Sequence, residues 1–273
     1  AEAPDGPIDI TISDAAGNTL LAYATPLAIT PVDAPDLEGE AAWQKTLPED
    51  TQLFMAAQLL DRKNHPEAAR EKYEEVLAVS PGHVDALNGL ATLLLERGDY
   101  EGCIAQTKKA IRVDEESSDA WYLQGAAQLA LGQADEAIVS GYKVVQGSED
   151  IARGYSLVGR AKMLQKEFLA AVEAFAQARH LAPENTRYRD WWLTARYTKG
   201  EDIAAHLAPL RDALDPTNFN LHALAAVSDP AEAEGALALW QQESGERVFT
   251  LMEVVTFFTN LGLYEEAATI LEG

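Results

Sequence analysis

The side chains that most often bind metals or carry out catalysis are scattered along this sequence. The five histidines are His65, His83, His180, His206 and His222. None of them has a second metal-binding side chain at the spacing of a motif such as HExxH. The sequence also lacks the glycine-rich loops that bind phosphates and the GxSxG turn that presents a nucleophilic serine. We therefore predict no catalytic residue, no metal site and no cofactor, and we do not expect an enzyme.

Two arginines have a spacing that suits ligand binding. Arg153 and Arg160 lie seven residues apart, which is about two turns of a helix, so they share one helix face. On that face two guanidinium groups could hold a carboxylate of a peptide. The alternative is that they neutralise neighbouring acids in an acidic chain, and the sequence leaves both interpretations open.

Three aromatic residues, Tyr188, Trp191 and Trp192, form a second candidate site. Exposed on a groove, they could stack on a peptide or on a sugar ring. Large aromatic side chains at helical spacing more often fill a hydrophobic core, and we favour that interpretation here.

The charge of the chain excludes some classes of partner. It carries 44 acidic and 21 basic residues, a formal net charge of −23. Such a surface repels phosphate backbones and anionic lipids, so we expect neither a nucleic acid nor a membrane as partner. An acidic face for a basic partner and plain solubility both remain explanations. The acidic pairs Glu115-Glu116 and Glu265-Glu266 are expected at loops or helix starts, where carboxylates complement backbone N–H groups.

Cys103 is the only cysteine, which rules out an internal disulfide and a thiolate metal cluster. We expect a buried, unreactive thiol, because the equivalent positions described below carry alanine. No apolar run approaches the roughly 18 residues that a membrane span needs. We expect a soluble protein, in the cytoplasm rather than secreted, although a chain that begins at Ala1 without methionine also fits a mature secreted protein or a piece of a longer one.

The elements that position these side chains fall into two predicted domains. In residues 1–47, the alternation of residues 8–12, the turn residues 13–18 and the apolar residues after them predict a β-hairpin. The prolines and acids of residues 25–40 predict an extended connector, and a short helix is expected at 41–45. One hairpin is marginally stable alone, so it packs on the helices or belongs to a sheet missing from this chain.

Residues 48–273 repeat with a period of 34 residues. This step separates the small residues Ala69, Cys103, Ala137, Ala171 and Ala205. It also separates the turn residues Asn64, Gly98, Gly132 and Gly200, with Lys166 as an exception in residue type. A constant period of this length indicates an α-solenoid of helix pairs.

The repeats resemble the tetratricopeptide repeat family, whose pattern runs W-x2-L-G-x2-Y, A-x3-F, A, P. The fourth unit matches best, with Tyr155, Gly159, Ala171, Phe175, Ala178 and Pro183. The fifth unit, 185–216, is degenerate; residues 218–244 fit a shortened pair with a turn at Ser228-Asp229-Pro230, and a seventh unit starts near Val248 with Gly262, Tyr264 and Ala267. The resemblance implies an all-α solenoid of about seven helix pairs after the short hairpin.

The same resemblance implies a function. In this family the first helix of each pair lines a concave groove, which here would present Asp85, Asn88, Tyr122, Arg153, Ser156 and Arg160. We therefore expect a non-catalytic scaffold for protein–protein interaction, with a peptide or a protein domain as partner. The Lys, Asn and Arg set of the family's carboxylate-clamp subtype is missing, so recognition of chaperone tails is not expected.

A looser resemblance covers the whole length, from IDITISDAAGNTLLAY through HPEAAREKYEEVL to LGLYEEAATILE. It is to large bacterial proteins that join a mutarotase-like β-sandwich domain of unknown function to a C-terminal repeat array. It implies an alternative function, a structural accessory domain of a larger carbohydrate-related protein. Its partner would then include its own preceding β domain, of which residues 1–47 would hold the last pieces.

Overall fold

The structure, a computed structural model, describes residues 9–14, 16–24, 43–147, 150–210, 215, 217–229, 235 and 247–272. The chain forms two compact units, Ala1–Leu47 and Pro48–Gly273. The connector expected at residues 25–40 lies outside the described residues, as do the first two positions of the short helix expected at 41–45. Each unit is taken by itself below.

The first unit contains an antiparallel hairpin of β1 (Asp9–Ser13) and β2 (Thr19–Ala24). Its turn is closed by the Asp14 carboxylate, which accepts hydrogen bonds from the backbone N–H of Ala16 at 2.9 Å and of Asn18 at 2.8 Å. Ile12 pairs with Leu21, so both side chains lie on one face of the hairpin. The hairpin that the alternation predicts is confirmed.

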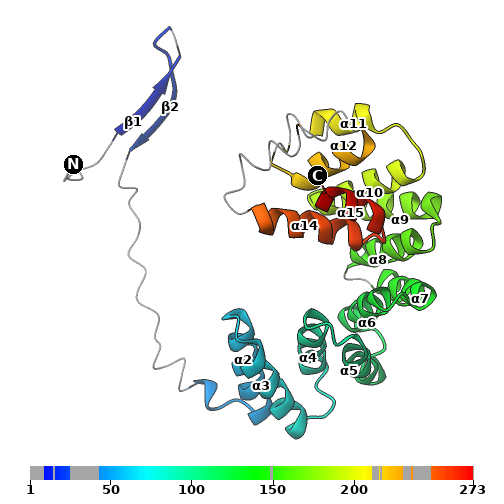
Figure 1. The fold of residues 1–273 in the computed structure, drawn as a ribbon. Coiled ribbons are helices and arrows are strands. Elements are labelled where there is room, and N and C mark those ends of the chain that lie inside the picture. The colour runs from blue at the N-terminus through cyan, green and yellow to red at the C-terminus, as the bar shows by residue number, and fades with distance from the viewer. Residues whose placement is uncertain are drawn as a thin grey trace. The chain divides into compact units, whose positions relative to one another are not determined.

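The second unit is a series of helix pairs, which Figure 1 shows following one another along the chain. Among the described residues there are six pairs and one further first helix, α12. The first helices are α2 (Glu49–Arg62), α4 (Val84–Glu96), α6 (Ser118–Ala130), α8 (Ile151–Leu164), α10 (Thr186–Thr198), α12 (Phe219–Ser228) and α14 (Arg247–Thr259). The second helices are α3 (Pro66–Val79), α5 (Tyr100–Val113), α7 (Ala134–Gln146), α9 (Phe168–Leu181), α11 (Ala204–Pro209) and α15 (Tyr264–Glu272).

A residue in the left-handed region ends the first helix of most pairs. Asn64, Gly98, Gly132 and Gly200 have φ values of 57°, 80°, 73° and 87°. Lys166 has φ 59°, so the fourth unit keeps the turn conformation although it lacks the usual residue type. The 34-residue step therefore predicts backbone conformation more faithfully than residue identity.

Small residues set the distance between the two helices of a pair. Ala69, Cys103, Ala137 and Ala171 are all completely buried, as the period predicts. The prediction is wrong for Ala205, which is exposed. In the fifth pair Ile203 and Leu207 are buried instead, and α11 is only six residues long with Pro209 inside it. Helix α11 begins at Ala204, two residues later than the 34-residue step from Phe168 at the start of α9 places it, so the repeat register shifts there.

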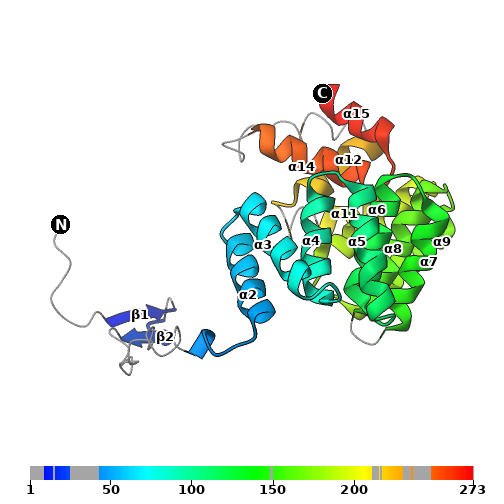
Figure 2. The same ribbon diagram turned by 90° about the horizontal axis from the view of Figure 1, so that it is seen from below.

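The seventh unit has the expected features in the expected places. Gly262 adopts φ 75° at the turn and Ala267 is 3% exposed. In the sixth unit only α12 and its end are described, because Pro230 and most of residues 231–244 lie outside the described part. Helices α4 to α9 lie side by side in Figure 2.

The last helices pack on the middle of the array. One hydrophobic cluster joins buried side chains of α8, α9, α10, α12, α14 and α15, with Phe175, Phe258 and Leu261 among the most deeply buried. A side-chain carbon built at Gly262 would lie 2.7 Å from Leu164, which shows how closely the last turn approaches α8. The C-terminal pair therefore shares a core with the fourth and fifth repeats.

Candidate binding groove

Four charged side chains occupy equivalent positions on successive first helices. Asp85, Asp119, Arg153 and Arg187 are each 34 residues apart, on α4, α6, α8 and α10. We call them the charge row. The Arg153 guanidinium nitrogen Nη1 lies 2.7 Å from Asp119 Oδ1, so the two middle members form an ion pair. The row therefore runs from an acid on α4, through a neutralised pair, to an arginine on α10.

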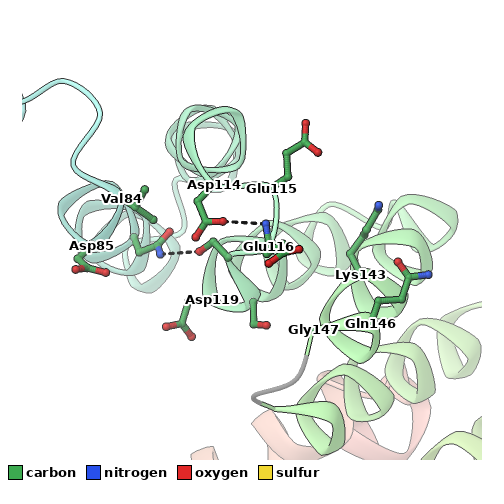
Figure 3. A pocket seen from close by; sticks show the side chains of 12 residues that line it. Val84, Asp85, Asp114, Glu115, Glu116, Asp119, Lys143, Gln146 and Gly147 are labelled. Carbon is green, nitrogen blue, oxygen red and sulfur yellow. Dashed lines mark hydrogen bonds between the residues drawn. The ribbon is translucent and has the colours of Figure 1, made fainter.

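A pocket of about 750 Å³ opens at the acidic end of the charge row. Figure 3 shows that its side chains come from the start of α4, the turn between α5 and α6, and the end of α7. The Asn88 side-chain amide donates a hydrogen bond to Ser117 Oγ at 3.3 Å and links the first two of these elements. Five carboxylates and one lysine line the pocket, so it favours cationic groups. These residues are Asp85, Asp114, Glu115, Glu116, Asp119 and Lys143.

Tyr122 brings the two predicted arginines together. The Arg153 guanidinium carbon lies 3.7 Å from the centre of the Tyr122 ring. Arg160 interacts with the Tyr122 side chain as well, and its guanidinium carbon lies 5.7 Å from the centre of the Trp191 ring. Arg153 and Arg160 thus share one face of α8, as their spacing predicts.

The two arginines differ in electrostatic state. Burial alone would lower the pKa of Arg153, but the hydrogen bond to Asp119 and the neighbouring Tyr122 outweigh it, and the pKa is raised. Burial lowers the pKa of Arg160, and the positive charge of Arg187 acts in the same direction. Arg160 donates to neutral oxygens, the backbone and side-chain oxygens of Asn260 at 3.3 and 3.5 Å, in addition to its interaction with Tyr122. Among the described residues no carboxylate lies within ion-pair distance of Arg160, so its charge is not neutralised.

Ser156 does not lie on the groove surface, which corrects the sequence-based expectation. It is 2% exposed, and its hydroxyl donates to the backbone oxygen of Arg153 at 2.7 Å. It also hydrogen-bonds the Tyr188 side chain. Ser156 lies three residues from Arg153, on the same side of α8, but its side chain is buried rather than exposed.

The aromatic candidate site is mostly hydrophobic core. Tyr188 and Trp191 are 8% and 6% exposed and belong to the cluster that joins α8 to α15. Trp192 is half-buried, with the guanidinium carbons of Arg179 and Arg196 at 4.0 and 4.7 Å from its ring centre. The core interpretation therefore holds for Tyr188 and Trp191.

The sequence interpretation missed three polar residues that contact or align with the predicted groove residues. Asp119 and Arg187 could have been found by applying the 34-residue step to Asp85, as for the alanines. Asn260 contacts Arg160 across 100 residues of sequence, and no local pattern signals that contact.

Several other features bear on chemistry. No group of histidine, cysteine, aspartate and glutamate side chains in the described part is arranged to hold a metal ion. None of the described helices is long and apolar enough to cross a membrane. Cys103 is buried as expected, and burial raises the pKa of its thiol to about 11.

Comparison with known proteins agrees with this architecture. The family model for the tetratricopeptide repeat matches residues 59–127. The fold of the helical unit is an α-solenoid of helix pairs, as in tetratricopeptide-repeat structures. The human tetratricopeptide repeat protein 7B is 29% identical over 85 residues, which are 31% of this chain. The matched region spans only 10% of that protein's length.

Two solved structures share the fold. A tetratricopeptide repeat protein from Parabacteroides merdae superposes with a TM-score of 0.60 at 12% identity, over 82% of this chain and 91% of its own. TTC0263, a thermophilic tetratricopeptide-repeat protein from Thermus thermophilus, gives 0.54 at 18% identity, over 66% and 98%. At these identities the likeness concerns the solenoid fold.

Proposed function

We propose that this protein is a non-catalytic scaffold whose groove binds an extended peptide segment of a partner protein. The charge row carries this proposal, because side chains at one repeat position face the same groove and change from acidic to basic along it. The acidic pocket beside Asp85 favours a basic group of the partner, and the arginines near Tyr122 favour an acidic one. A peptide with charges at both ends would therefore bind in one direction.

The test compares partner recovery by the full 273-residue chain and by an Arg153→Glu/Arg160→Glu variant. Lys108→Glu/Lys109→Glu is the matched control, since both lysines are exposed on α5 and the change in net charge is the same. We expect the control to recover the same partner as the native chain and the arginine variant to lose it. Melting curves establish that all three chains are folded. Equal recovery by all three folded proteins would contradict binding in this groove.

A second candidate function is favoured by the hairpin. Ile10, Ile12 and Leu21, which share one face, are 50%, 51% and 57% exposed. An apolar face of this kind is normally covered by another part of a protein. We propose that it packs on a β domain of a larger polypeptide, which would make this chain the structural accessory part of a carbohydrate-related bacterial protein.

The gene sequence upstream of Ala1 tests this second candidate. A β-rich domain encoded in the same reading frame would support it, and the hairpin amides would exchange more slowly with deuterium in the longer polypeptide. The absence of such a domain, or equal exchange in both polypeptides, would contradict it.

A further inference from the structure

The first helices of the last three repeats, α10, α12 and α14, enclose a second pocket, with a volume of about 360 Å³. An adjoining pocket of about 270 Å³ shares three of its residues, Arg187, Asn220 and Glu253, so the two lie side by side, and we call them together the cleft. The cleft lies at the basic end of the charge row. The other residues that line the 360 Å³ pocket are Trp191, Phe249, Met252, Thr256, Phe257 and Asn260.

Two residues that line this cleft each carry a buried polar atom with no hydrogen-bond partner among the described residues. These atoms are the indole Nε1 of Trp191, a donor, and the side-chain oxygen Oδ1 of Asn220, an acceptor. Trp191 is 6% exposed, so its N–H has little access to bulk solvent. Buried polar groups in native proteins are nearly always paired. A peptide backbone offers both the oxygen that Trp191 lacks and the N–H that Asn220 lacks.

The rim of the cleft is apolar. Phe249 and Met252, on the first turns of α14, are 71% and 57% exposed, and Phe257 behind them is 7% exposed. Aromatic and methionine side chains are enriched at protein-binding surfaces because they supply contact area with few polar atoms. This rim suits an aliphatic or aromatic side chain of a bound segment.

The cleft also contains an arginine whose charge is not neutralised. No acidic side chain of the described residues lies within 4.0 Å of the Arg187 guanidinium, although the chain has 44 acids. Three carboxylates line the same cleft. Asp190 and Asp215 are paired with Arg189 at 2.8 and 2.9 Å, and Glu253 forms no ion pair with Arg187 in the described structure. Arg160 is close enough for the like charge of Arg187 to act on it. An acidic side chain from a partner would therefore meet two positive charges.

We propose that this cleft binds an extended peptide segment in which an aliphatic or aromatic side chain stands next to an acidic one. The segment's backbone pairs with Trp191 and Asn220, its apolar side chain covers Phe249 and Met252, and its carboxylate pairs with Arg187. The proposal deepens the proposed scaffold function and rests on it. The segment would bind to α10, α12 and α14, next to the arginines of α8.

An array of synthetic peptides, probed with the full-length chain, tests the proposal. The probes carry leucine or phenylalanine beside aspartate, and matched probes carry alanine for the apolar residue or lysine for the acid. We expect binding of the first set and a loss of roughly tenfold or more in affinity for each matched set. Arg187→Glu and Met252→Asp, both at exposed positions, should each weaken binding to a similar extent. Lys108→Glu, with the same change of charge on α5, should leave it unchanged.

Three outcomes would overturn the proposal. These are the absence of binding by any probe, preference for the lysine probes, and equal binding by the native chain and the Arg187→Glu variant. They are distinguishable from failure of the scaffold function. If the chain still recovers its partner through Arg153 and Arg160 but binds none of these probes, binding in the groove is supported and only binding in the cleft is contradicted.

Discussion

The backbones of α7 and α8 approach each other closely at Gly154, so we predict that Gly154→Ala destabilises the protein. Gly154 is buried on α8, where that helix crosses α7. A side-chain carbon at this position would lie 2.8 Å from the backbone oxygen of Gly141 and 2.8 Å from the backbone nitrogen of Val145. Neither atom can rotate away as a side chain can, so the added methyl group forces the two helices apart.

The expected cost follows from two opposing terms. Overpacking a well-packed core costs about 1–3 kcal/mol, and a clash with two backbone atoms belongs in the upper part of that range. Alanine is favoured over glycine inside a helix by about 1 kcal/mol. The net loss in free energy of unfolding is then about 1–2 kcal/mol. In a chain of this size it lowers the melting midpoint by about 2–8 °C.

Thermal melts followed by far-ultraviolet circular dichroism measure this difference. Gly82→Ala is the control, because its added carbon would lie 3.5 Å from Val113, an ordinary contact, and should leave the midpoint unchanged or slightly raised. A Gly154→Ala midpoint equal to or above that of the native chain would refute the close approach of α7 and α8.

Two further predictions concern titratable groups. Asp50 at the start of α2 accepts a hydrogen bond from Ser80 Oγ at 2.7 Å, which lowers the pKa of the Asp50 carboxyl. Its contribution to stability is therefore present above the ordinary carboxyl pKa and lost as the pH falls below about 4. The urea midpoints of the native chain and Ser80→Ala should differ at neutral pH, and the difference should shrink as the pH falls below about 4. A difference that does not change with pH would contradict this origin. Cys103, whose pKa burial raises to about 11, should react with a disulfide reagent at mildly alkaline pH far more slowly in the folded chain than in urea, and equal rates would show that the thiol is accessible.

The repeat fold follows from the sequence because its determinants are local. A turn residue able to adopt positive φ and a small residue on the second helix recur at a constant step, and each acts within one helix pair. Lys166 adopts positive φ at the position that the 34-residue step predicts for a turn, although lysine is not a typical turn residue. Cys103 is buried at the position where the other repeats carry a buried alanine. The face of α8 that carries Arg153 and Arg160 was predictable for the same reason.

The local pattern does not specify how deeply a side chain is buried, which charges form ion pairs, or which residues far apart in sequence touch. These depend on the packing of neighbouring repeats. Ser156 has a position appropriate to the groove but is buried. Ala205 keeps the 34-residue step but is exposed, because α11 begins two residues later than that step places it. Asn260 reaches Arg160 because the last repeat packs against the fourth and fifth.

The sequence alone therefore determined the repeat unit and its turns, since helical periodicity and turn chemistry act over a few residues. The tertiary structure decided which charges of the row are neutralised and where the second cleft forms. Both depend on packing between repeats far apart in the chain, where small differences in helix length and register accumulate.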